Sequence, residues 1–348
     1  MVDRCAPNPC VSYRGGVPSL SPVIAEIRLA VRTALAELPE GSTVIVGLSG
    51  GADSLALTAA TVFEARSRGI HVLSATVDHG LQEGSSLIAS TAAVAAEGVG
   101  VDDALQTRVE VDRSSGSGIE AAARDARYAA LAGIARAEKA TAVLLGHTLD
   151  DQAETVLLGL ARGSGATSLQ GMAPTREDED GLRWIRPLLG VRRETTRAFC
   201  AASDLEFWDD PHNLDDRFAR VRARETVLPV LEAELGPGIA EALARTAEQL
   251  REDAEAFDEM IHETIEDIVE HAEAGISVSV AALAANPAAL RNRIIRLVVD
   301  SEFGVSLTRA QTLEVARLVT DWSGQGPIDL PGCSAVRRGG QVVFAARS

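Results

Sequence analysis

Short β-branched runs alternate with longer amphipathic segments along the first half of the chain. Apolar residues at helical spacing predict intervening helices, and strands that alternate with such helices imply a parallel sheet. We therefore expect an α/β fold, whose ligands bind beyond the carboxyl ends of the strands. The predicted strands are Thr43–Gly47, Ile70–Val77, Ala104–Val109 and Ala142–Gly146, and the predicted helices are 22–41, Ser54–Arg66, Ser86–Glu97, Gly118–Glu138 and Asp150–Arg162.

The pattern changes beyond about Pro229. Residues 236–273 read as one long, acidic, helical segment, and shorter helical segments continue to about residue 319. Two apolar runs separated by glycine turns then predict a hairpin-like tail. The shorter helical segments are Val278–Ala282, Arg291–Val299 and Thr308–Val319, and the runs of the tail are Pro327–Leu330 and Val342–Ala345.

These patterns divide the chain into three parts. Residues 1–20 are rich in Pro, Gly, Ser and Cys, which predicts a disordered extension. Residues 21–229 are expected to form the α/β domain. Residues 230–348 are expected to form a mostly helical linker and a small α/β C-terminal domain.

The composition argues against export and membrane association. Hydrophobic residues make up 46% and charged residues 24% of the chain, as in ordinary globular proteins. No stretch reaches the roughly 18 uninterrupted apolar residues of a membrane helix, and the first residues lack an apolar signal core. The four cysteines form no CxxC pair. We expect a cytoplasmic protein with reduced thiols; the sequence leaves a homodimer open.

The net charge of -17 argues against indiscriminate binding of nucleic acid. The charge is unevenly spread, however. Residues 225–273 carry fifteen acidic and two basic side chains, whereas residues 183–224 carry nine arginines and seven acids. A polyanion could therefore be held locally by arginines outside the acidic segment.

A glycine-rich loop joins the first predicted strand to the next helix. It reads Ser49-Gly50-Gly51-Ala52-Asp53-Ser54. Glycines let the backbone approach phosphate oxygens closely, and successive N–H groups at a helix N-terminus form a positive pocket. The hydroxyls of Ser49 and Ser54 add donors, and the Asp53 carboxylate can bind a phosphate-bridging Mg²⁺. The loop predicts a nucleotide phosphate site, although it matches neither GxxxxGK[ST] nor GxGxxG.

The loop resembles the SGGxDS signature of the PP-loop ATP pyrophosphatases, which cleave ATP between the α and β phosphates and leave AMP on a carbonyl oxygen. Further stretches resemble blocks of one branch, the tRNA(Ile)-lysidine synthetases. The resemblance covers roughly residues 40 to 345 and implies a PP-loop domain of the adenine nucleotide alpha hydrolase-like type. The VDHGLR, NxEaxARxxRY, GHHxDDQxET…RGSG, RPLL and DxxN…RxxxR blocks of that family are matched at residues 77–81, 118–128, 145–165, 186–189 and 209–224, respectively.

The resemblance implies a two-step ligase. ATP adenylates the C2 carbonyl oxygen of the wobble cytidine in the minor isoleucine tRNA, which carries a CAU anticodon. The ε-amine of free lysine then displaces AMP, and decoding changes from AUG to AUA. A cytosine carbonyl needs this activation because its oxygen is a very poor leaving group. ATP and lysine are therefore expected as substrates, tRNA(Ile) as the partner and Mg²⁺ as the cofactor.

The candidate site residues lie at the ends of predicted strands and on the helices that follow. Arg124, with Arg127 on the same helix, is expected to stabilise charge as pyrophosphate leaves; a solvated helix face is the alternative. We expect ATP binding from loop residues 49–54 and from Val77, Asp78, His79 and His147, catalysis from Asp53, Arg124, Asp151 and Glu154, and Mg²⁺ binding from Asp53.

Two carboxylates are expected to receive the lysine. Asp150 and Glu154 share one helical face, and Asp151 and Glu154 are the candidates for holding the ammonium and removing its proton. Acids at a helix N-terminus also complement the helix dipole, which is the simpler alternative. The pattern does not tell which carboxylate is the base.

A set of arginines is expected to contact tRNA phosphates near the wobble base. Arginines two residues apart on an extended segment would point the same way and offer a row of forked donors, whereas on a helix they would spread around the axis. A solvated loop with scattered charge is the alternative. The set comprises Arg192, Arg193, Arg220, Arg222 and Arg224.

Three departures from the family pattern accompany the match. Thr148 stands where a second histidine is usual, Gln82 where an arginine is usual, and the late element reads Arg-Val-Arg-Ala-Arg at 220–224. Other readings are weaker. An iron–sulfur tRNA thiolase would need a CxxC pair, and GMP and NAD synthetases lack the RGSG and DxxN blocks. A nucleotide-binding module without chemistry would usually lack the intact loop.

Overall fold

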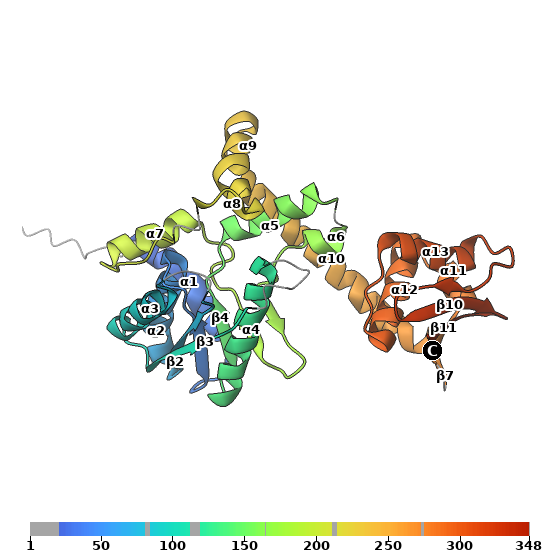
Figure 1. Cartoon of the computed structure of the whole chain (residues 1–348), viewed down its shortest axis with the longest axis horizontal. Coiled ribbons are helices and arrows are strands. Elements are labelled where there is room, and N and C mark those ends of the chain that lie inside the picture. The colour runs from blue at the N-terminus through green and yellow to red at the C-terminus, as the bar shows by residue number, and fades with distance from the viewer. Residues whose placement is uncertain are drawn as a thin grey trace, which may run out of the picture. The chain divides into compact units, whose positions relative to one another are not determined.

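The computed structural model describes residues 21–80, 84–111, 119–163, 165–210, 214–272 and 275–347. The predicted extension at 1–20 and the departure at Gln82 lie outside these residues. The chain divides into two compact units, Met1–Glu248 and Gln249–Ser348 (Figure 1). The predicted domain boundary after residue 229 lies earlier than this division, so α9 and the first turns of α10 belong to the first unit.

A six-stranded sheet forms the centre of the first unit. The strand order is β3-β2-β1-β4-β6-β5, and every neighbouring pair is parallel except β5 with β6. The predicted α/β fold with a parallel sheet is therefore confirmed. The strands are β1 Thr43–Gly47, β2 His71–Asp78, β3 Asp103–Arg108, β4 Ala142–Leu145, β5 Thr175–Glu177 and β6 Arg183–Ile185.

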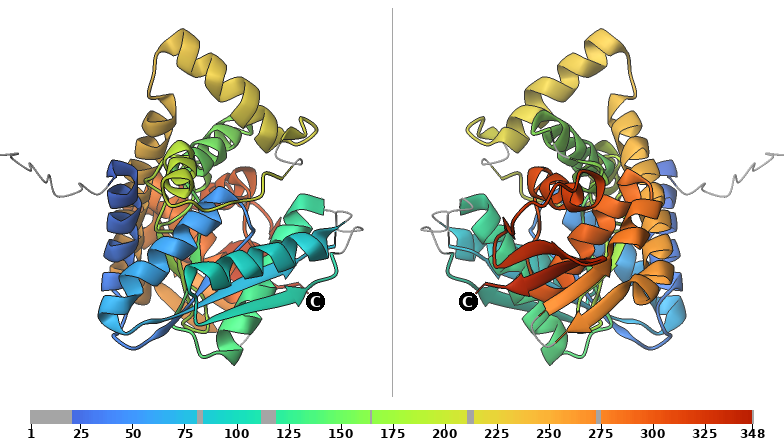
Figure 2. Two further views of the ribbon diagram at one scale, coloured as in Figure 1. Left: turned by 90° about the vertical axis from the view of Figure 1, so that its left-hand side faces the viewer. Right: turned by 90° about the vertical axis from the view of Figure 1, so that its right-hand side faces the viewer.

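Helices cover both faces of this sheet, which explains why the three middle residues of β1 are all apolar. Val44 and Val46 face one core with α1, α2 and α7, whereas Ile45 faces a second core with α4 (Figures 1 and 2). Alternate residues of a strand point to opposite faces, so both sets must be buried. The helices are α1 Pro22–Ala36, α2 Ala52–Ala65, α3 Ser85–Val99, α4 Ile119–Ala137, α5 Leu149–Ala161, α6 Ala166–Leu169, α7 Arg193–Ala202, α8 Ala219–Arg222, α9 Leu228–Leu235 and α10 Ile239–Ile268.

The strand order places the functional motifs together. The chain runs from β1 outward through β2 and β3, and then returns to place β4 on the other side of β1. The loops after β1 and β4 therefore leave the sheet in opposite directions and open a crevice at their carboxyl ends, where ligands of α/β sheets bind. The glycine-rich loop follows β1 and His147 follows β4.

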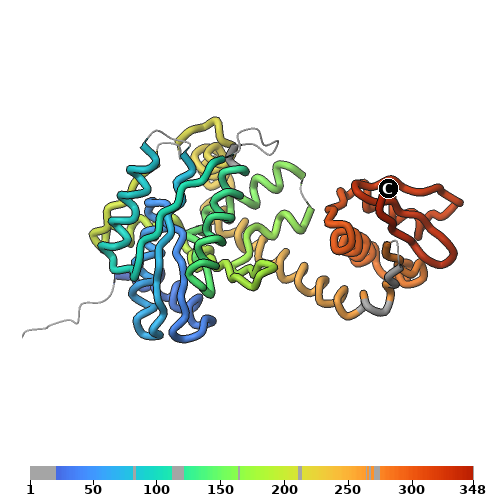
Figure 3. The backbone as a smooth tube through the Cα atoms, turned by 60° about the horizontal axis from the view of Figure 1, so that its bottom comes forward, coloured from blue at the N-terminus to red at the C-terminus, as the bar shows by residue number. Residues whose placement is uncertain are grey.

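The second unit contains a five-stranded antiparallel sheet of order β7-β8-β11-β10-β9. A terminal hairpin is present, at the red end of the tube in Figure 3, but its arms are β10 and β11. The predicted run Val342–Ala345 lies in β11, whereas the predicted run Pro327–Leu330 contains β9, which pairs with β10. The prediction of a helix at Val278–Ala282 is wrong: β8 runs to Ser279, whose side chain caps the helix that follows. The elements are β7 Val269–Ala272, β8 Gly275–Ser279, α11 Val280–Ala285, α12 Ala288–Phe303, α13 Arg309–Thr320, β9 Ile328–Asp329, β10 Cys333–Arg338 and β11 Gln341–Ala346.

Candidate active site

The glycine-rich loop is held in shape by its own serines. The buried Ser54 hydroxyl donates to the Gly51 carbonyl at 3.0 Å and accepts the Ser49 backbone N–H at 3.1 Å. The Ser49 hydroxyl lies 3.1 Å from it. Both hydroxyls thus close the turn between β1 and α2, and the Ser49 hydroxyl stays at the rim of the loop.

Two glycines allow the close approach that this turn requires. Gly50 has φ +85°, a left-handed conformation that side chains disfavour. Gly146, after β4, lies against the start of α2: a Cβ there would stand 3.1 Å from backbone atoms of Asp53 and Ser54. A side chain at position 146 would therefore crowd the first turn of α2, which carries Asp53.

Asp53 lies in the first turn of α2 and is held from α7. The Thr196 hydroxyl hydrogen-bonds one of its carboxylate oxygens, and the Arg193 Nε lies 3.6 Å from the other. Burial raises the pKa of the Asp53 carboxyl above its usual value, against the opposing effect of these two partners. Thr196 was not among the predicted site residues, and no sequence signal indicated its contact with the loop.

The start of α5 fixes the orientation of Asp151. Thr148 caps the helix: its hydroxyl accepts the Asp151 backbone N–H, and the Asp151 carboxylate accepts the Thr148 backbone N–H at 2.8 Å. Although burial acts in the opposite direction, Arg193 and Arg220 lower the pKa of Asp151 to about 2. Thr148, where the family pattern has a second histidine, therefore serves as the cap that orients Asp151.

Glu154, one turn further along α5, is fully buried and bonded by three guanidinium groups. Arg224 Nε lies 2.7 Å from Oε1 and Arg220 Nε lies 2.9 Å from Oε2. Arg193 Nη1 lies 3.2 Å from Oε1 and also donates through Nη2 to Asp151 at 2.8 Å. A buried carboxylate requires such partners, because removing its charge from water is costly.

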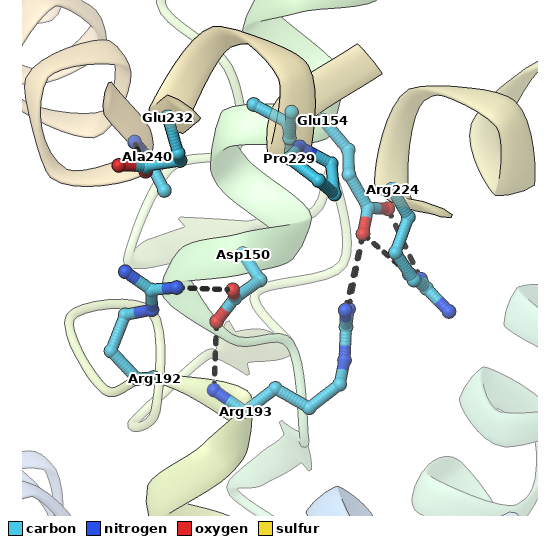
Figure 4. A pocket seen from close by; sticks show the side chains of 9 residues that line it. Asp150, Glu154, Arg192, Arg193, Arg224, Pro229, Glu232 and Ala240 are labelled. Atoms are coloured by element: carbon cyan, nitrogen blue, oxygen red, sulfur yellow. Dashed lines mark hydrogen bonds and ion pairs between the residues drawn. The ribbon is translucent and has the colours of Figure 1, made fainter. Parts of the chain in front are cut away.

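Asp150 and Glu154 line one polar cavity, as their shared helical face predicts. The cavity measures about 140 Å³. Figure 4 shows Arg192 and the Arg193 backbone N–H converging on Asp150, while the Arg193 side chain extends to Glu154. Its lining residues are Asp150, Glu154, Arg192, Arg193, Arg224, Leu228, Pro229, Glu232 and Ala240.

A second, cationic group of side chains faces His147 at the end of β4. Arg186 is buried and donates to the Ala173 carbonyl at 2.7 Å and to the Tyr128 hydroxyl at 3.4 Å. The exposed Arg124 lies 5.5 Å from the Tyr128 ring, and Arg127 lies on the same helix. In the described parts of the chain, none of these three arginines forms an ion pair. Burial lowers the pKa of His147 to about 3, so the imidazole is neutral.

Asp78 ends β2 as predicted and anchors the following segment. Its carboxylate accepts the Gly80 backbone N–H and the Ser86 hydroxyl, each at 2.9 Å. Although burial acts in the opposite direction, hydrogen bonding to Ser85, Gly80 and Ser86 lowers the pKa of the Asp78 carboxyl. Val77 and His79 flank it on the same strand end. Their binding to adenosine stays a prediction.

The structure overturns the extended conformation expected for the late arginine segment. Arg220 and Arg222 lie on α8, and Arg224 lies in the π-helical turn that follows. Arg220 and Arg224 point inward to Glu154, whereas Arg222 is exposed and bonds backbone carbonyls of its own segment. Arg192 and Arg193 also bind carboxylates. The helical turn is favoured because it directs two guanidinium groups to one buried charge.

No metal cluster is preformed: among the described residues, no three His, Cys, Asp or Glu side chains are arranged to hold a metal ion. Likewise, the described helices include none long and apolar enough to cross a membrane.

Comparison with known proteins agrees with this geometry. Residues 25–231 match the PP-loop domain family, and residues 279–343 match the TilS substrate binding domain. The chain is 57% identical to the tRNA(Ile)-lysidine synthase of Leifsonia xyli, over 88% of this chain and 91% of that protein. It is 47% identical to the tRNA(Ile)-lysidine synthase of Thermobifida fusca, over 93% of this chain and 98% of that protein.

One solved structure is similar in fold. The U34-tRNA thiolase NcsA from Methanococcus maripaludis, solved with its [4Fe-4S] cluster, superposes with a TM-score of 0.55 at 21% identity, over 66% of this chain and 80% of that one. This likeness supports the PP-loop fold. The family match and the two synthase relatives show more than the fold. The chain is an ATP-using ligase that belongs to the tRNA(Ile)-lysidine synthase family.

Proposed function

We propose that the chain joins free lysine to C2 of the wobble cytidine in the tRNA(Ile) that carries a CAU anticodon, through an adenylated tRNA intermediate, and so changes decoding from AUG to AUA. The observation that carries the proposal is the meeting of the PP-loop with Asp151 and Glu154 at one crevice of the sheet. The names of the full-length relatives support the same reaction.

In the first step, the C2 oxygen of cytidine attacks the α-phosphorus of ATP, and pyrophosphate leaves. The loop after β1 would hold the phosphates with its backbone N–H groups at the start of α2. The guanidinium groups of Arg124, Arg127 and Arg186, which form no ion pair within the described residues, lie near His147 and would balance the charge that develops on the phosphates.

Asp53 fits a Mg²⁺ ion bound together with ATP. Mg²⁺ commonly takes one or two carboxylates and completes its shell with phosphate oxygens and water, so a single carboxylate at the loop suffices. The ion would neutralise charge on the phosphates. The Arg193 Nε lies 3.6 Å from this carboxylate, a contact long enough for a metal ion to displace the guanidinium.

In the second step, the ε-amine of lysine attacks C2, the C2–O bond breaks and AMP leaves. Asp151 and Glu154 would hold the lysine ammonium. A carboxyl with a pKa of about 2 pairs well with a cation but accepts protons poorly, so we assign Asp151 to holding the ammonium. The amine must lose a proton before it attacks. Glu154, the neighbouring carboxylate, is the candidate acceptor of this proton.

Arg222 is the exposed member of the predicted tRNA-binding set and is proposed to contact a phosphate of the tRNA. Contacts from Arg192, Arg193, Arg220 and Arg224 would require these side chains to leave their present carboxylate partners.

A paired assay tests the proposal. Pyrophosphate release should require both ATP and tRNA, which separates the enzyme from a nucleotide-binding module. AMP release should require lysine as well, which separates the ligase from a thiolase. AMP release in the presence of a sulfur donor but without lysine would refute the ligase assignment.

A further inference from the structure

The carboxylates proposed to bind lysine are already neutralised by arginines. Asp53, Asp151 and Glu154 carry three negative charges, and Arg193, Arg220 and Arg224 carry three positive charges within ion-pair distance of them. An incoming ammonium would therefore add a charge to a balanced, buried group. Because an unbalanced buried charge is costly, the amine can bind well only if one guanidinium leaves.

Arg193 is the arginine best placed to leave. It alone among the three contacts all three carboxylates, at 2.8 Å to Asp151, 3.2 Å to Glu154 and 3.6 Å to Asp53. Arg220 and Arg224 keep Glu154 paired at 2.9 and 2.7 Å without it. After Arg193 leaves, Asp151 keeps only the longer contact with Arg224, at 3.7 Å, among its ion pairs in the described part of the chain, so its carboxylate can accept an ammonium.

The backbone of Arg193 is held by contacts that do not involve its guanidinium. Its N–H donates to Asp150 at 2.7 Å, and α7, which begins at Arg193, is bound to the PP-loop through the contact of Thr196 with Asp53. The guanidinium is 21% exposed and already reaches Asp53 at the phosphate loop. It can therefore turn toward a bound polyphosphate by rotation of side-chain bonds alone.

We propose that Arg193 is a positioning residue that couples the two substrates: bound ATP draws its guanidinium to the phosphates, and this movement frees Asp151 for the lysine ammonium. The inference rests on the proposed function, since it takes lysine as the amine. It predicts that lysine binds poorly to the free protein and well to the nucleotide complex. By thermodynamic linkage, lysine must strengthen nucleotide binding by the same factor.

Calorimetric titration of the full chain tests this coupling. Lysine is titrated into the protein with and without saturating α,β-methylene-ATP, which cannot be cleaved at the reactive bond. We expect the nucleotide analogue to lower the lysine Kd by about 10-fold or more. In Arg193→Gln, lysine should bind the free protein more tightly than in the native chain, and the analogue should change its Kd less than about twofold.

The control variants separate this role from a general loss of structure. Arg136→Gln, which removes an exposed ion pair with Asp180 elsewhere in the first unit, should keep the native coupling. Arg193→Lys, which retains a cation, should keep part of it. If the analogue leaves the lysine Kd of the native chain unchanged, the inference is overturned. Full coupling in Arg193→Gln would also overturn it. Absence of lysine binding under every condition would overturn the proposed function together with the inference.

Discussion

Replacing Glu154 by glutamine removes one charge and keeps the shape of the side chain. The carboxylate is fully buried and accepts hydrogen bonds from Arg193, Arg220 and Arg224. Breaking a buried ion pair from one side costs about 3–5 kcal/mol, because the remaining charge is left uncompensated. The three arginines are 21–24% exposed, so water can solvate them in part. We therefore expect a loss near the lower limit, about 3 kcal/mol.

Thermal unfolding measures this loss. A free-energy change of 1 kcal/mol shifts Tm by about 2–4 °C in a unit of this size, so Glu154→Gln should lower the Tm of the first unit by about 6–12 °C. Asp180→Asn is the matched control, since Asp180 pairs with Arg136 but is 64% exposed. An exposed pair contributes less than about 1 kcal/mol. A Tm for Glu154→Gln within about 2 °C of the control would refute the view that Glu154 binds this arginine cluster together.

Further predictions concern His147, Asp53, Arg222 and the second unit. Because the pKa of His147 is about 3 in the folded protein and about 6.5 when unfolded, the unfolded state gains protons first as the pH falls. The native chain should therefore lose about 1–2 kcal/mol of stability between pH 7 and pH 5 in urea titrations, and His147→Gln should not. Asp53→Asn should slow tRNA-dependent pyrophosphate release about 100-fold or more with an unchanged circular dichroism spectrum; full activity would refute its role. Arg222→Ala should lower the log–log salt slope of tRNA affinity by about one, and an unchanged slope would place the phosphate contacts elsewhere. A chain that ends after Glu248 should bind ATP but lose discrimination among tRNAs; undiminished discrimination would show that the second unit is not needed for it.

The elements with strong local signals could be predicted from the sequence. The strand Thr43–Gly47 has three consecutive apolar residues because its middle is buried on both faces, and it was predicted with its observed bounds. The loop after it and the acidic start of α5 follow strand ends, where a parallel sheet brings ligand sites together. In contrast, β5 and β6 have three residues each, which is too few to show the alternation of apolar and polar residues that marks a strand. The first helix ends at Ala36 rather than near Gly41, because Leu38 continues the helical spacing of apolar residues beyond the end of the helix.

The pairing of charges in the site could not be predicted in the same way. Arg193 and Thr196 meet Asp53 from about 140 residues away, and only the packing of α7 against α2 brings them together. The inward direction of Arg220 and Arg224 depends on the burial of Glu154, which becomes evident only once α5 is placed. The sequence indicated which charged residues are present, but long-range contacts decide which of them are paired.

Formation of lysidine itself tests the central claim most directly. The full chain is incubated with ATP, lysine and tRNA(Ile) bearing a CAU anticodon, and the digested tRNA is analysed by mass spectrometry. We predict that the wobble cytidine is converted to its lysine adduct only when all three substrates are present, and that the methionine tRNAs, which share the anticodon, are not modified. An unmodified cytidine in the complete reaction, with ATP consumed, would contradict the assignment.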